Sequence, residues 1–76
     1  MNKLIIDLAN EKMFLMIITS NNIYNITKEN TKFNYEKLAL IICEFLKSNK
    51  LRLTDINKIY LNKGPGSFAG IRNSLS

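Results

Sequence analysis

The first part of the chain alternates between short apolar runs and short polar turns. This pattern predicts three strands, at residues 3–8, 13–19 and 23–27, joined by turns at 9–12 and 20–22. The first run, Leu4-Ile5-Ile6, is continuous and typical of a central strand that is buried on both faces. The third run alternates apolar and polar residues, as an outer strand does. Because the connections are short, we expect an antiparallel meander.

A helix is expected next, capped by Asn34 and running over residues 35–48. Leu40 and Cys43, with Ala39, widen its apolar face beyond what one sheet needs. Either the helix is well buried in its own domain, or its second face meets a partner. The residues that recur at three- and four-residue spacing, and so are expected to pack on the sheet, are Leu38, Ile41, Ile42, Phe45 and Leu46.

A fourth apolar run, residues 56–61, follows the helix and predicts a strand parallel to the first through a right-handed crossover. The Gly-Pro-Gly turn at 64–66 comes next, and Ser67 stands where the N-cap of a second helix is expected. The free N–H groups at such a helix start suit an anion or a carboxylate. The turn is open to two readings, a plain structural turn or a binding loop. It is neither a P-loop nor a dinucleotide loop, because the spacing required for each fails.

The composition is that of one small globular unit, and it excludes several kinds of site. The 76 residues carry a net charge of +5, with lysines scattered along the chain, which fits either a codon bias of the genome or a surface that faces RNA. Histidine is absent and Cys43 is the single cysteine, so a Cys/His zinc site and a histidine-based catalytic pair are both excluded. We expect no metal site. We also expect neither a signal peptide nor a membrane span, because no apolar run is long enough, and we therefore expect a cytoplasmic protein.

The string GPGSFAGIR, residues 64–72, closely resembles the GPGSFTGLR signature of the TsaB (YeaZ) family, which belongs to the actin-like, Hsp70-like ATPase superfamily. Residues 4–7 and the Leu-Thr-Asp-Ile run at 53–56 also resemble family segments. Ala69 departs from the signature, where the family usually has threonine. The residues taken as the family signature loop are Gly64, Pro65, Gly66, Ser67, Phe68, Gly70 and Arg72.

The resemblance implies an α/β fold, the amino-terminal part of a ribonuclease-H-like half-domain. Its expected order is a three-strand antiparallel meander, a helix, a parallel strand and the start of a second helix. Residues 1–76 are expected to form a single, incomplete subdomain, since family members are several times longer.

The family resemblance also implies a role without catalytic residues. TsaB proteins support a TsaD-type enzyme that carries out threonylcarbamoyl modification of adenosine in tRNA, and any ATP or metal belongs to that partner subunit. The partner is expected to be a TsaD-type subunit in a heterodimer, or a second copy through the same helices, with tRNA engaged indirectly and no membrane. The residues expected at the interface are Leu40, Cys43, Phe68 and Ile71.

Asp7 is the one carboxylate at a strand end that the resemblance singles out, and its role is open between structural and functional. The family usually has threonine next, whereas Leu8 follows here, and residues 7–11 contain no Gly, Ser or Thr that could hold a phosphate. The alternatives to a scaffold are a degenerate fragment without function, a glycoprotease-like or nucleotide-binding enzyme, and a module that binds tRNA directly.

Overall fold

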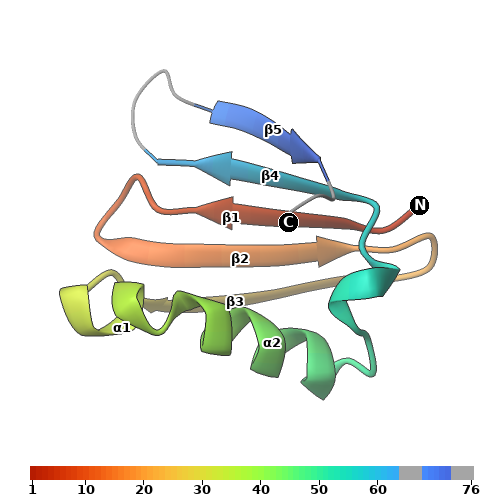
Figure 1. The fold of residues 1–76 in the computed structure, drawn as a ribbon, viewed down its shortest axis with the longest axis horizontal. Coiled ribbons are helices and arrows are strands. Elements are labelled where there is room, and N and C mark those ends of the chain that lie inside the picture. The colour runs from red at the N-terminus through yellow and green to blue at the C-terminus, as the bar shows by residue number, and fades with distance from the viewer. Residues whose placement is uncertain (64–67, 73–76) are drawn as a thin grey trace.

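The chain folds as one twisted sheet with α-helices on one of its faces (Figure 1). The structure is a computed structural model that describes residues 1–63 and 68–72, the latter segment as backbone only. The sheet has five strands in the order β3-β2-β1-β4-β5. Its strands are β1 (Lys3–Asp7), β2 (Lys12–Ile18), β3 (Ile23–Glu29), β4 (Lys58–Asn62) and β5 (Phe68–Arg72). Between β3 and β4 lie α1 (Lys32–Glu36), α2 (Leu38–Ser48) and the 3-10 helix η1 (Leu53–Asp55).

The predicted topology of the first four strands is confirmed. β1, β2 and β3 form an antiparallel meander, and β4 pairs in parallel with β1. Asn2 and Asn57 fix the register of that parallel pair, because the Asn2 N–H donates to Oδ1 of Asn57 at 2.8 Å and the Asn57 N–H donates to the Asn2 carbonyl at 2.8 Å. The two strands therefore start together, and their carboxyl ends meet at the same edge of the sheet.

The core lies between the sheet and α2. Alternate residues of the strands face the helix, and Phe45 and Leu46 meet them from α2. The core residues, each at most 5% exposed, are Leu4, Ile6, Met13, Leu15, Ile17, Phe45, Leu46, Ile56 and Ile59. Ile5, on the opposite face of β1, is only half-buried. The expectation that β1 is buried on both faces is therefore wrong, because the described residues place α-helices on one face alone.

The helical segment begins earlier than expected and is divided in two. Thr31, not Asn34, is the N-cap, and its hydroxyl accepts from the Asn34 N–H at 3.1 Å. The Asn34 side chain is used elsewhere, since its amide donates to the Glu29 carbonyl at 2.8 Å. A tight turn at Lys37 then separates α1 from α2, with the Lys37 N–H donating to the Asn34 carbonyl at 3.0 Å. The predicted core stripe of the helix is confirmed by the burial of its residues.

The carboxyl end of α2 closes through a left-handed residue. Lys50 has a φ of 61°, and the Leu51 N–H reaches back to the Leu46 carbonyl at 2.9 Å while the Lys50 N–H reaches the Lys47 carbonyl at 3.0 Å. This pair of bonds is the Schellman arrangement, which usually places glycine at the left-handed position. The turn directs the chain into η1 and back toward the sheet.

The second helix expected after Ser67 is wrong for residues 68–72, which form β5, antiparallel to β4. Gly70 does not decide between the two, because glycine is unfavourable in the middle of a helix and of a strand alike. The physical reason for the strand is the neighbouring edge of the sheet. The outer edge of β4 offers a row of backbone N–H and C=O groups, and an adjacent strand pairs with them directly.

Candidate functional site

The signature loop is only partly within the described residues. Gly64, Pro65, Gly66 and Ser67 lie outside them, so the predicted turn and the predicted N-cap are not described. The backbone of the remaining signature residues lies in β5, where Phe68 pairs with Asn62, Gly70 with Tyr60 and Arg72 with Lys58. In sequence the signature follows β4, and the carboxyl end of β4 lies beside the carboxyl end of β1.

Asp7 ends β1 at this edge and links it to two neighbouring segments. Its Oδ1 accepts from the Ala9 N–H at 3.0 Å and from Nδ2 of Asn62 at 3.2 Å. The Leu8 N–H donates to the Asn62 carbonyl at 2.7 Å, which extends the contact between the ends of β1 and β4. The carboxylate thus turns the chain out of β1 and joins the first hairpin to the strand that precedes the signature.

Asn30 holds the same hairpin from the other side, and the sequence did not indicate this. Its Nδ2 donates to the Leu8 carbonyl at 3.0 Å and to the Asn10 carbonyl at 2.8 Å, and its N–H donates to the Glu11 carbonyl at 2.9 Å. Both ends of the hairpin are therefore tied into the fold. The sequence shows only an asparagine just after the third apolar run. The residues that it binds lie about twenty positions earlier in the chain, so no local pattern indicates the contact.

The chemistry of the hairpin follows from these bonds. The N–H groups of Leu8 and Ala9 both donate to atoms of this chain. No hydroxyl side chain lies in the hairpin. Anion binding by a backbone loop needs several N–H groups directed at the ligand. This geometry does not form such a loop from Leu8 and Ala9.

Leu40 and Cys43, the two predicted interface residues in the helical segment, lie on the outer side of α2. Leu40 is 52% exposed and Cys43 is exposed, whereas Phe45 and Leu46 on the inner side are buried. The wide apolar arc of the sequence is therefore divided between the core and the surface. Phe68 and Ile71, the other two predicted interface residues, lie in β5, where only the backbone is described.

A shallow pocket adjoins Cys43, between the end of α2 and η1. It combines apolar side chains with two cations, and it is lined by Cys43, Leu46, Lys47, Leu51, Arg52 and Leu53. The sequence did not predict this pocket, because Arg52 and Leu53 belong to a connector that carries no periodic pattern. The turn at Lys50 brings them against the last turn of α2.

Two further kinds of site are not found in the described part of the chain. Residues 1–63 and 68–72 contain no group of three or more carboxylate or thiol side chains placed to hold a metal ion. No helix among them is long and apolar enough to span a membrane.

Comparisons with known proteins found similarity both in sequence and in fold. It is 40% identical over 62 residues to the tRNA threonylcarbamoyladenosine biosynthesis protein TsaB of Buchnera aphidicola subsp. Baizongia pistaciae, a match that covers 82% of this chain and 28% of that protein. The fold is similar to that of YeaZ from Pseudomonas aeruginosa, with a TM-score of 0.73 at 15% identity, over 87% of this chain and 31% of the other. No family model matches the chain. The chain thus spans less than a third of the length of either relative.

Proposed function

Because the chain is similar to the amino-terminal part of TsaB (YeaZ) proteins in both sequence and fold, we propose that it acts in tRNA threonylcarbamoyladenosine biosynthesis as a non-catalytic partner subunit. Its role is to bind and support a TsaD-type enzyme, which supplies the catalytic residues and any ATP or metal. It meets tRNA only through that complex, in the cytoplasm.

The observation that carries the proposal is the exposed apolar side of α2. Leu40 leaves 52% of its surface exposed on the face opposite the core, with the exposed Cys43 one turn further on. Apolar side chains that gather on one side of a helix are characteristic of surfaces that another protein covers. Burying such side chains contributes about 25 cal/mol for each Å² removed from water.

The hairpin argues for a scaffold over a nucleotide-binding enzyme. Two of its N–H groups are occupied within the chain, and its residues bring neither glycine nor hydroxyl to a phosphate. Phosphoryl transfer depends on groups that position and neutralise the phosphates. A glycoprotease-like reaction has no histidine base to draw on.

Coexpression with a TsaD-type subunit followed by size exclusion tests the proposal. We expect a stable one-to-one complex that Leu40→Glu weakens, because the substitution places a charge in the apolar contact. The matched control is Ile23→Glu on β3, which changes another exposed apolar residue, 63% exposed, in the same way and should leave the complex intact. Failure of the unaltered chain to bind, or equal weakening by both variants, would refute the proposed role of α2.

A further inference from the structure

The pocket between α2 and η1 has a chemistry that suggests what covers it. Its lining is Cys43, Leu46, Lys47, Leu51, Arg52 and Leu53. Leu46 belongs to the core and is 2% exposed, so it forms a fixed apolar floor. Leu53 is 42% exposed and forms part of the wall.

Two cations, Lys47 and Arg52, stand beside this apolar lining. Within the described residues, the ion pair that forms joins Lys12 of β2 to Glu29 of β3, and neither Lys47 nor Arg52 takes part in one. The carboxylate nearest to Lys47 in sequence is Glu44 on the same helix, and no ion pair joins the two among the described residues. The carboxylate nearest to Arg52 is Asp55, which accepts from the backbone N–H of Arg52 at 2.8 Å. The two side-chain charges are therefore available to a ligand.

The combination of an apolar lining with two cations favours one kind of occupant. An apolar side chain would fill the space over Leu46, and carboxylates next to it would meet the two cations. Charges at the rim of an interface select partners and speed their association, while apolar anchors at the centre hold the complex. The pocket also continues the surface of Leu40, which lies one turn before Cys43 on the same helix.

We propose that this pocket receives an apolar side chain of the partner subunit that is flanked by Asp or Glu residues. The inference rests on the proposed function, since it takes the TsaD-type subunit as the partner, and it adds the chemistry of the contact. The partner surface is accordingly acidic around a single apolar anchor. The pairing depends on salt because the carboxylates and the two cations attract each other across a solvated rim.

Cys43 provides a direct measure of whether the pocket is covered. It is the single cysteine of the chain and is exposed. We expect the rate at which N-ethylmaleimide alkylates its thiol, followed by mass spectrometry of this subunit, to fall about tenfold or more in the complex with the TsaD-type subunit. A complex that forms while Cys43 reacts at the rate of the free chain would overturn the inference and leave the proposed function standing.

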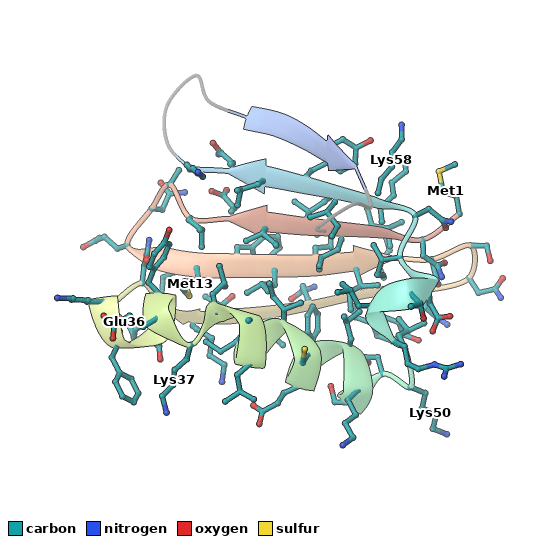
Figure 2. The ribbon with its side chains drawn as sticks, viewed as in Figure 1. Met1, Met13, Glu36, Lys37, Lys50 and Lys58 are labelled. Atoms are coloured by element: carbon teal, nitrogen blue, oxygen red, sulfur yellow. The ribbon has the colours of Figure 1, made fainter. Side chains whose placement is uncertain are left out.

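A charge reversal tests the acidic character of the partner. The double variant Lys47→Glu/Arg52→Glu should raise the Kd of the complex about tenfold or more at low salt, and the difference should shrink at high salt. The matched control is Lys58→Glu/Lys63→Glu, which makes the same change in net charge on exposed residues away from the pocket; Lys58 lies on β4, on the opposite side of the molecule from α2 (Figure 2).

The remaining outcomes identify other occupants. Equal Kd values for both double variants would show that the partner is not acidic at this pocket. Protection of Cys43 in the chain alone, as its concentration rises, would assign the pocket to a second copy, and protection by a single-stranded RNA oligonucleotide would assign it to nucleic acid. Each of these results overturns the inference, and the absence of any complex would overturn it together with the proposed function.

Discussion

Lys50 is the residue where a substitution by glycine should stabilise the chain. It is the one non-glycine residue among the described residues with a positive φ, 61°, and it lies just beyond the end of α2. In this left-handed conformation the Cβ of an L-residue approaches the following carbonyl, at a cost of roughly 1–2 kcal/mol. Glycine has no Cβ and avoids that contact.

The expected gain is the difference between two terms. Lys50→Gly removes the steric cost of roughly 1–2 kcal/mol, but glycine loses about 0.5–1 kcal/mol more backbone entropy on folding. The bonds from the Lys50 and Leu51 N–H groups to α2 are backbone bonds and remain. The free energy of unfolding should therefore rise by about 0.5–1 kcal/mol. For a domain of this size that corresponds to roughly 2–8 °C in Tm.

Urea unfolding followed by far-ultraviolet circular dichroism measures the change. The midpoint should rise for Lys50→Gly while the slope with urea stays constant, because the surface exposed on unfolding is unchanged. Lys47→Gly is the matched control, since it makes the same exchange within the last turn of α2 and should cost about 1 kcal/mol. Equal destabilisation by the two variants would refute the account of the left-handed turn.

Three further substitutions test contacts described above, each by the shift of the same unfolding midpoint. Asn30→Ala removes the side-chain bonds to the Leu8 and Asn10 carbonyls and should cost about 1–3 kcal/mol; an unchanged midpoint would show that water replaces both bonds. Thr31→Ala removes the N-cap of α1 and should cost about 1 kcal/mol, whereas Thr31→Ser should recover most of the loss. Lys12→Ala breaks the exposed ion pair with Glu29 and should change stability by less than about 1 kcal/mol, so a larger loss would contradict its exposed setting.

The parts of the fold that the sequence predicted correctly rest on local patterns. Apolar runs separated by short polar turns over residues 3–27 predicted the meander, and the spacing of Phe45 and Leu46 predicted the inner face of α2. The parallel pairing of β1 with β4 followed from chain connectivity, because a strand that comes after a helix commonly returns beside the first strand.

The parts that the sequence did not predict depend on distant partners. Residues 68–72 have an apolar spacing that suits a short helix. They form a strand instead, because they pair with the edge of β4. The sequence alone identifies Asn30 only as a loop residue. Its role depends on its hydrogen bonds to the hairpin, which exist only in the folded chain. Arg52 and Leu53 line a pocket only because the turn at Lys50 brings them against α2. No periodic pattern in the connector indicates that turn.

The central position of β1 has a consequence for how the chain forms on the ribosome. β1 is made before the other four described strands, yet one of its two neighbours, β4, lies 55 residues later, with Lys3 opposite Lys58. At synthesis rates of about 5–20 residues per second, that neighbour arrives roughly 3–11 seconds after β1. During this interval the meander and α2 can already pack. The edge of β1 that later pairs with β4 still has unpaired backbone N–H and C=O groups, and a strand of another chain can pair with them. The nascent chain is thus most vulnerable to wrong pairing at the strand that later becomes the middle of its sheet.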